Sequence, residues 1–344
     1  MRLIRTVIVD DSAFVRKAVR EMLSRSSEID VVGAARNGEE ALQMVEQLQP
    51  DVVTCDLLMP QMDGVGFVRK QMTRKPVPIL ILTASPQDAV RVIEALESGA
   101  VDFIQKPTAL ANNDLLAMRE ALIEKVKEVA LFASPPPVLP VPAVSFAAEP
   151  SRPAAEVDIV VLGISTGGPQ ALRYLLPQFA PDFPVPLVIV LHMPLGYTAP
   201  FAEKLADISR LPVKEAPEGC LVQPGEALLA PAGRHLTFKK NSNGQVVVQL
   251  SIHPMEKPHR PSVDVLFQSA AETFQQRVLG VVMTGMGEDG KEGAGWIKAQ
   301  GGTVLTQDEQ SCVIYGMPRS VVEAGLSDAA VPLASMAAEI SKRL

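Results

Sequence analysis

Apolar stretches that alternate with amphipathic helical stretches constrain the fold of this chain most. In the first 130 residues, each of five apolar stretches precedes a segment with helical periodicity. The apolar stretches cover residues 6–11, 30–35, 51–60, 78–85 and 101–107. Strands that are apolar along most of their length suit a parallel sheet that helices cover on both faces. The sequence therefore predicts a doubly wound, five-stranded parallel sheet whose functional site lies at the carboxyl ends of the strands.

A proline-dense stretch follows this first region. Residues 134–153 read "SPPPVLPVPAVSFAAEPSRP" and show neither helical nor strand periodicity. Proline lacks an amide hydrogen for helices and sheet ladders, so such a stretch favours extended, semi-rigid segments. We expect one domain over residues 1–132, a linker over 133–155, and a second domain over 156–344.

The second region repeats the alternation. Apolar stretches at residues 158–163, 186–192, 278–285 and 302–307 each precede a helical pattern, which predicts another α/β domain with a mostly parallel sheet. An insert at residues 211–251 contains two strand-like runs, 226–238 and 245–252, joined by the turn "NSNG". These runs predict an appended antiparallel hairpin.

Composition narrows the class of protein. Of 344 residues, 47% are hydrophobic and 21% charged, and no apolar run approaches the roughly 18 residues that a membrane helix needs. No cleavage site follows the short apolar start, so we expect a soluble, cytoplasmic protein that meets membranes only through its partners. The net charge of -7 has the wrong sign for a protein that neutralises nucleic acid.

The cysteines carry no clear chemistry. Cys55, Cys220 and Cys312 are odd in number and lack paired spacing, which argues against disulfides and a zinc site. Cys312 has no candidate base near it in the sequence, so a nucleophilic role is disfavoured.

Charged and hydroxyl side chains gather where the first five strands end. Asp10 and Asp11 end the first strand, Asp56 the third, Thr83 the fourth, and Lys106 the fifth. Crowded carboxylates repel one another unless a hard cation joins them, and Mg²⁺ accepts such oxygens while keeping waters. Helix capping would explain any one of these residues, but not all five strand ends together.

The motifs "VDDS", "CDLLMPQMDG", "ILTAS" and "DFIQKP" resemble those of a response-regulator receiver domain with a flavodoxin-like fold, over about the first 130 residues. The resemblance implies that Asp56 accepts a phosphoryl group from a chemotaxis-type histidine kinase. It also implies that Asp10 and Asp11, with Asp56, bind Mg²⁺. The residues that would relay the change are Thr83, Phe103 and Lys106.

The segment "GISTG" at residues 163–167 fits the G-x-S-x-G pattern, in which a strand-to-helix turn exposes a serine. An apolar strand precedes Ser165 and a helical pattern follows it, so nearby amides could stabilise an oxyanion or bind a phosphate. The serine could also be only the N-cap of the helix.

A serine nucleophile needs a base and a carboxylate that orients it. Among four histidines, His192 ends an apolar strand and so reaches the same edge as Ser165. We expect the other three, His235, His253 and His259, to be surface or loop residues. Asp289 lies in a Gly-rich loop at another strand end, with Glu288 as its rival. The order Ser, His, Asp differs from that of α/β-hydrolases.

These stretches, with "LHMPLGYTAPFAEKL", "RPSVDVLFQSAA" and "MTGMGEDG", resemble the chemotaxis receptor methylesterases of the CheB family. The resemblance implies hydrolysis of glutamate γ-methyl esters on methyl-accepting chemoreceptors and deamidation of certain glutamines. It implies that Ser165 is the nucleophile, His192 the base and Asp289 its partner, with an oxyanion hole at the amides of Thr166 and Met286. No cofactor is implied in this catalytic domain. It also implies that the unphosphorylated receiver holds the esterase back.

Two other functions compete with this one. A response regulator with a DNA-binding output would carry a basic helix-turn-helix after the linker, where this sequence has Gly-rich strand ends. Alternatively, the second domain binds a phosphate-bearing ligand or partner at Ser165 without catalysis. The glycine spacing, however, does not fit G-x-G-x-x-G.

Overall fold

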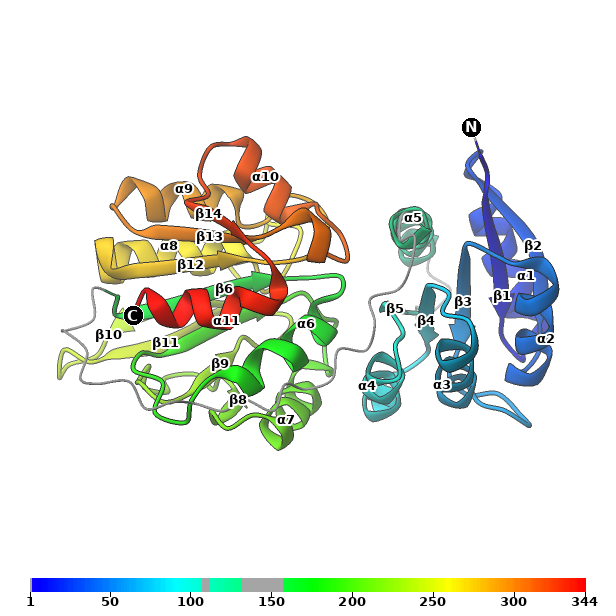
Figure 1. Ribbon diagram of the computed structural model, residues 1–344, viewed down its shortest axis with the longest axis horizontal. Helices are drawn as coiled ribbons and strands as arrows, with labels where there is room; N and C mark the ends of the chain where they lie inside the picture. Colours follow the sequence, from blue (N-terminus) through cyan, green and yellow to red (C-terminus); the bar gives the residue numbers. More distant parts are fainter. Residues whose placement is uncertain (1, 107–111, 131–156) are drawn as a thin grey trace. The chain divides into compact units, whose positions relative to one another are not determined.

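The chain folds into two units, one within residues Met1–Leu139 and the other within Pro140–Leu344. The computed structural model describes residues 2–106, 112–130 and 157–344 (Figure 1). The predicted linker, residues 133–155, lies outside the described residues. No described helix combines the length and apolar character that a membrane crossing requires.

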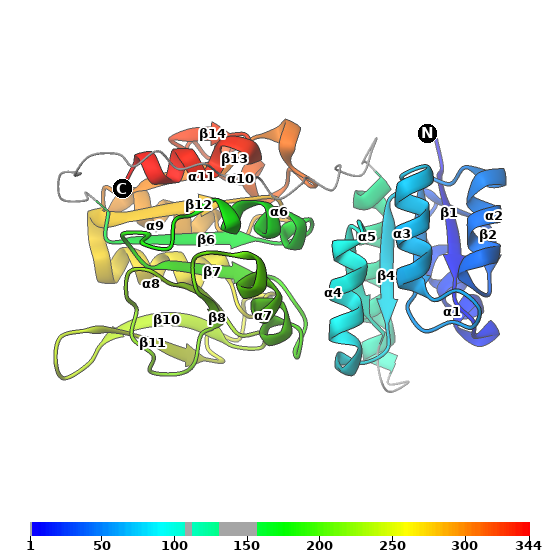
Figure 2. The ribbon, with the colours of Figure 1, turned by 60° about the horizontal axis from the view of Figure 1, so that its bottom comes forward.

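The first unit is the predicted doubly wound sheet. Its five parallel strands have the order β2-β1-β3-β4-β5. Helices α1 and α5 pack together on one face, and α2, α3 and α4 pack on the other (Figure 2). The strands are β1 (Ile4–Val9), β2 (Ile29–Ala35), β3 (Val52–Asp56), β4 (Ile79–Thr83) and β5 (Asp102–Gln105). The helices are α1 (Ala13–Leu23), α2 (Gly38–Leu48), α3 (Gly64–Arg74), α4 (Ala89–Glu97) and α5 (Asn112–Ala130).

Three of these helices have an N-cap residue whose polar side chain bonds to the first turn. The side chains of Ser12, Asn37 and Asp63 accept hydrogen bonds from the first-turn amides of α1, α2 and α3. Such N-caps satisfy amides that have no partner within the helix. They fix where the chain turns away from the carboxyl edge of the sheet.

The second unit has a seven-stranded parallel sheet of order β14-β13-β12-β6-β7-β9-β8. Its strands are β6 (Ile159–Ile164), β7 (Leu187–Leu191), β8 (Val213–Glu215), β9 (Ala227–Leu229), β12 (Val278–Val282), β13 (Thr303–Gln307) and β14 (Ala329–Val331). Its helices are α6 (Gly168–Leu175), α7 (Thr198–Ile208), α8 (Val263–Phe274), α9 (Lys291–Ala299), α10 (Met317–Glu323) and α11 (Leu333–Lys342).

The predicted hairpin is confirmed, but the first of its two predicted strands is divided into two parts. Strands β10 (His235–Lys240) and β11 (Val246–Ser251) pair antiparallel as a separate sheet. The first predicted run, 226–238, is broken: β9 joins the parallel sheet beside β7, and only the part from His235 pairs with β11. Pro231 and Gly233 interrupt the run between these two strands, which explains the division.

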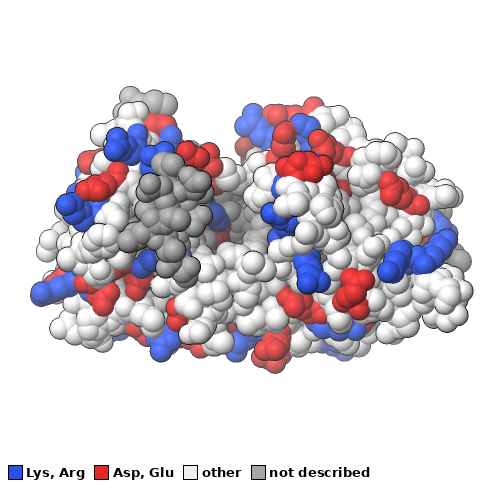
Figure 3. Space-filling model, turned by 180° about the vertical axis from the view of Figure 1, so that it is seen from behind, with Lys and Arg blue, Asp and Glu red and all other residues white. Residues whose placement is uncertain are grey.

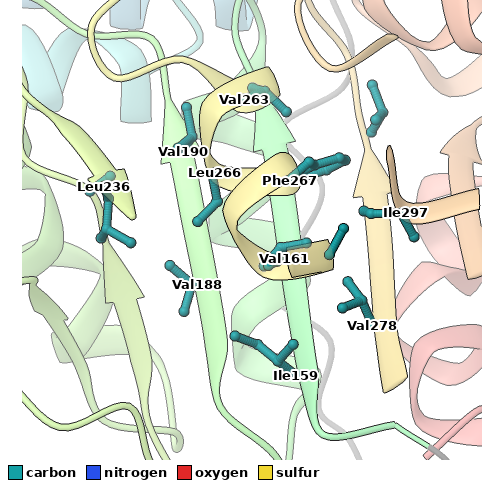
Figure 4. Close-up of a cluster of buried hydrophobic side chains, with 14 of the residues drawn as sticks. Ile159, Val161, Val188, Val190, Leu236, Val263, Leu266, Phe267, Val278 and Ile297 are labelled. Carbon is teal, nitrogen blue, oxygen red and sulfur yellow. The ribbon is translucent and has the colours of Figure 1, made fainter. Parts of the chain in front are cut away.

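Helix α8 lies directly over the centre of the large sheet. Its side chains Val263, Leu266 and Phe267 are fully buried among residues of β6, β7 and β12 (Figure 4). Gly163 on β6 permits this approach, because a Cβ there would lie 2.2 Å from Cγ1 of Val263. The position of the amino end of α8 therefore depends on a glycine in the neighbouring strand.

The charged surface is mixed in sign. On the face drawn in Figure 3, Lys and Arg side chains are interspersed with Asp and Glu side chains. This mixing agrees with a chain that has 32 basic and 39 acidic residues.

The Gly163 contact predicts a stability difference between two glycine substitutions. Gly163→Ala should lower the free energy of unfolding of the second unit by about 1–3 kcal/mol, the usual cost of overpacking. The matched control is Gly295→Ala in α9, where the nearest atom to a new Cβ is 4.0 Å away. This control should raise the free energy of unfolding by roughly 0.5–1 kcal/mol, because alanine is a better helix former than glycine.

Urea unfolding, monitored through the fluorescence of Trp296, measures the free energy of unfolding of both variants. Trp296 is the only tryptophan and lies on α9, so its signal reports on the second unit. Equal stability of Gly163→Ala and wild type would contradict the close approach of α8.

Candidate active sites

The structure brings Asp10, Asp56 and Lys106 together at the carboxyl edge of the first sheet. Asp56 is the last residue of β3, and Lys106 follows β5. Lys106 Nζ lies 2.5 Å from Asp56 Oδ1 and 2.7 Å from Asp10 Oδ2. The Leu58 amide donates to the other oxygen of Asp56 at 3.0 Å. One lysine therefore bridges two carboxylates that come from neighbouring strands.

Burial and charge oppose each other at this cluster. Burial raises the pKa of Asp56 above its ordinary value, although the Lys106 ammonium opposes the shift. Burial lowers the pKa of Lys106, but the charges of Asp56 and Asp10 outweigh it and leave that pKa raised. Lys106 therefore stays protonated between the two carboxylates.

The other predicted residues of this edge lie nearby in different environments. Thr83 ends β4 and is buried. Its carbonyl accepts a hydrogen bond from the Lys106 amide at 2.6 Å. Phe103 on β5 is also buried, whereas Asp11 is exposed. Among the described residues, no three His, Cys, Asp or Glu side chains stand close enough to form a ready metal cluster.

In the second unit, Ser165 and His192 are neighbours across two strands. Strands β6 and β7 pair in parallel with Ile164 opposite Leu191, so the next residues are Ser165 and His192. The His192 amide donates to the Ile164 carbonyl at 3.2 Å. Both residues therefore leave the carboxyl edge of the sheet side by side.

His192 is held by Asp289. His192 Nε2 lies 2.8 Å from Asp289 Oδ2, and both side chains are more than nine-tenths buried. A carboxylate only accepts hydrogen bonds, so Nε2 carries the proton and Nδ1 has the free lone pair. His192 Nδ1 is buried and has no hydrogen-bond partner in the described chain, the Ser165 hydroxyl included. Nδ1 is thus the nitrogen available to take a proton.

The amino end of α8 surrounds the Asp289 carboxylate with donors. The amides of Val263 and Asp264 and the Ser262 hydroxyl all donate to Asp289, at 2.8, 3.0 and 2.8 Å respectively. Burial raises the pKa of Asp289, but these bonds and the one from His192 outweigh it and leave the pKa well below its usual range. Glu288, the rival carboxylate, is exposed and pairs with Lys291.

Two glycines allow the chain to pack closely around Ser165. Gly167 adopts a φ of 79°, and a Cβ on Gly285 would lie 2.7 Å from Ser165 Cβ. Met286 follows Gly285, and its amide donates to no group in the described part of the chain. The Thr166 carbonyl accepts from the Thr284 hydroxyl at 3.0 Å, which holds the peptide between Thr166 and Gly167.

Three residues that the sequence did not single out complete the site. His259 stacks on His192, with ring centroids 4.1 Å apart. Asp264 and Ser262 lie at the start of α8 as described above. A serine before an apolar helical run could have indicated Ser262 as the residue that precedes α8, but no local signal places His259 against His192.

The expectation that His235 is a surface or loop residue is wrong. His235 is fully buried on β10; its Nδ1 accepts from the Ser262 amide at 3.3 Å and its Nε2 donates to the Pro254 carbonyl at 3.0 Å. Burial lowers the pKa of His235.

His253 and His259 are exposed loop residues. Cys312 is inert by environment, because burial raises the pKa of its thiol.

Comparison with known proteins identifies both units. The CheB methylesterase model matches residues 160–340, and the response regulator receiver domain model matches residues 6–118. The chain belongs to the CheB methylesterase family.

Individual relatives of the family match over almost the whole chain. A protein-glutamate methylesterase/protein-glutamine glutaminase of Myxococcus xanthus is 43% identical over 99% of this chain and 98% of its own length. One from Halalkalibacterium halodurans is 39% identical over 99% of this chain and 98% of that protein. The crystal structure of the Thermotoga maritima CheB methylesterase catalytic domain, 40% identical, matches 55% of this chain and 99% of its own with a TM-score of 0.53.

The bonds at Asp289 predict how acid affects stability. Asp289→Asn should be less stable at pH 7 by about 1–3 kcal/mol, because an amide nitrogen would face donors that now meet an oxygen. The folded-state pKa of Asp289 is depressed, so its contribution is complete above the unfolded value of about 4 and is lost as the pH falls below it.

The stability gap between wild type and Asp289→Asn should therefore narrow below about pH 4. Trp296 fluorescence in urea at a series of pH values measures it. Glu288→Gln, a change at the exposed neighbour, should leave the stability unchanged. A gap that stays constant down to pH 2 would contradict an ionised Asp289 at the amino end of α8.

Proposed function

We propose that this protein is a phosphorylation-activated protein-glutamate methylesterase that acts on methyl-accepting chemoreceptors. The observation that carries the proposal is His192 held by Asp289 at the strand edge beside Ser165, within the family match. The product of the reaction would be a receptor glutamate, with release of methanol. We propose deamidation of receptor glutamines by the same site, with release of ammonia.

Each residue has a role in the proposed reaction. Ser165 Oγ attacks the ester carbonyl while His192 Nδ1 takes its proton, and the new imidazolium is stabilised by Asp289. The amides of Thr166 and Met286 donate to the oxyanion that forms. His192 then gives the proton to the leaving methoxide, which departs as methanol. Water repeats the sequence on the acyl-enzyme and frees Ser165.

We further propose that Asp56 accepts a phosphoryl group from a chemotaxis-type histidine kinase, and that Thr83, Phe103 and Lys106 respond to it. Asp10, Asp11 and Asp56 would hold the Mg²⁺ that a receiver domain uses. The chemistry of these oxygens fits, because Mg²⁺ binds through one or two carboxylates and keeps several waters. When bound, the ion would neutralise phosphoryl oxygens.

The proposed triad predicts non-additive losses. Ser165→Ala and His192→Ala should each lower kcat by a factor on the order of 10⁴ or more, with little further loss in the double variant. Methanol released from methylated receptor membranes measures the rate. Ser335→Ala and His253→Ala change the same residue types at exposed positions and should keep full activity. Methanol release that survives Ser165→Ala would favour a site that only binds a ligand.

The receiver proposal predicts that Asp56→Asn abolishes modification by acetyl phosphate. Asparagine keeps the size of the side chain but lacks the nucleophilic charge, so neither the mass increase nor the activation should occur. Chelation of Mg²⁺ should abolish the mass increase in the wild type. Asp30→Asn removes the same charge at an exposed position of β2 and should be labelled as the wild type is.

A fragment that begins at Ala154 lacks the receiver and should not respond to acetyl phosphate. If it also demethylates receptors faster than the unphosphorylated chain, the receiver inhibits the esterase. Equal labelling of Asp56→Asn and wild type would contradict the assignment of the phosphoacceptor.

A further inference from the structure

Asp264 makes a second buried carboxylate beside Asp289. It is the second residue of α8, and its side chain is 11% exposed. Its Oδ1 accepts from the amides of Gly290 and Gly293 at 2.8 and 2.9 Å, and its Oδ2 accepts from Lys257 Nζ at 3.0 Å. Gly290 and Gly293 belong to the amino end of α9, so Asp264 caps a helix other than its own.

Helices α8 and α9 each accept a carboxylate at their amino end from the other helix or from the loop before it. Asp289 precedes α9 and accepts from the first amides of α8, while Asp264 belongs to α8 and accepts from the first amides of α9. Each bond of this pair holds the loop before α9 against α8. The loop that carries Asp289 is therefore fixed at both of its neighbouring helix ends.

The loop needs this restraint because glycines flank Asp289. Gly287 and Gly290 have φ values of 77° and 101°, a region that favours glycine and allows many alternative backbone states. The bonds from Gly290 and Gly293 to Asp264 hold the end of this loop on α8, in addition to the bonds that Asp289 accepts. A small displacement of Asp289 would move its oxygen away from His192 Nε2.

We propose that Asp264 is a positioning residue of the esterase, which keeps Asp289 on His192 by fixing the loop before α9. This proposal rests on the proposed triad. Asp264 does not touch the reacting atoms, so its effect should reach the rate only through Asp289. The substrate would be bound as before, since the bonds of Asp264 go to α9 and Lys257.

Two substitutions separate the parts of this role. Asp264→Asn can keep an oxygen toward Gly290 and Gly293 and loses mainly the Lys257 pair. Asp264→Ala loses both. We expect the alanine variant to lower kcat by about 10- to 100-fold with little change in KM, as a misplaced catalytic group does. The asparagine variant should stay within about 3-fold of the wild type, since the cap persists.

Asp328→Ala is the matched control. Asp328 accepts from the Val304 amide of β13 at 2.7 Å and from Lys298 at 2.6 Å, so it combines a bond from a backbone amide with a lysine pair in the same unit. Its loss should lower stability without lowering kcat. An equal loss of kcat in Asp328→Ala and Asp264→Ala would overturn the proposal in favour of general destabilisation.

A double-variant cycle tests whether Asp264 acts through Asp289. Asp264→Ala added to Asp289→Ala should cause no further loss of kcat, and multiplied losses would overturn the proposal. Wild-type kcat in Asp264→Ala together with a strong loss in Asp289→Ala would overturn this inference alone. Wild-type kcat in both Ser165→Ala and Asp289→Ala would overturn the proposed triad instead.

Trp296 fluorescence shows whether each variant folds. If Asp264→Ala does not fold, Asp264→Ser replaces it, because a single short hydroxyl cannot accept from both amides in the same way. The same expectations then apply: a loss in kcat with unchanged KM supports the proposal, and wild-type kcat contradicts it.

Discussion

The hydrogen bonds to the buried carboxylate of Asp289 are the interactions on which the arrangement of the second unit depends most. An ionised carboxylate loses several kcal/mol of hydration when it is buried, so it persists only where donors replace the water. Four groups donate here: His192, the Ser262 hydroxyl, and two amides at the amino end of α8. The partial positive charge of that helix end adds to them. Because α8 must supply these donors, its position on the sheet becomes part of the site.

The packing of α8 explains why the core and the site are not independent. Val263 donates its amide to Asp289 while its side chain packs on Gly163 of β6. Ser262, which also donates to Asp289, is held through its amide by the buried ring of His235 on β10. The hairpin, the central strand and the site are thus joined at two consecutive residues of the chain.

The two acidic sites follow the same rule of placement but differ in environment. Both lie at the carboxyl ends of parallel strands, where the loops meet. Asp56 has one amide donor and shares Lys106 with Asp10, and burial leaves its pKa raised. Asp289 has more donors and its pKa is lowered. In the triad proposed above, the carboxylate that orients the base must stay charged, and the donors around Asp289 favour its charged form.

Much of this arrangement was predictable from the sequence, because strand ends are local features. The parallel sheets, the meeting of Asp56 with Lys106, and the adjacency of Ser165 and His192 all follow from where apolar runs end. The contacts of Asp264, His235 and His259 do not follow, because each involves a loop, a hairpin strand or the start of a helix rather than the end of a parallel strand. The burial of His235 depends on the inserted hairpin packing against the loop before α8, for which the hairpin sequence carries no periodic signal.

The strand order also explains why Nε2 is the nitrogen of His192 that meets Asp289. In the chymotrypsin-type triad, Asp binds Nδ1 and the serine faces Nε2. Here Asp289 binds Nε2. Ser165 follows β6, the direct neighbour of β7, whereas Asp289 follows β12, which lies beyond β6. Nδ1 lies nearer the main chain and has no hydrogen-bond partner in the described chain. Nε2 extends farther from the main chain and so reaches Asp289, which follows a strand two places away in the sheet.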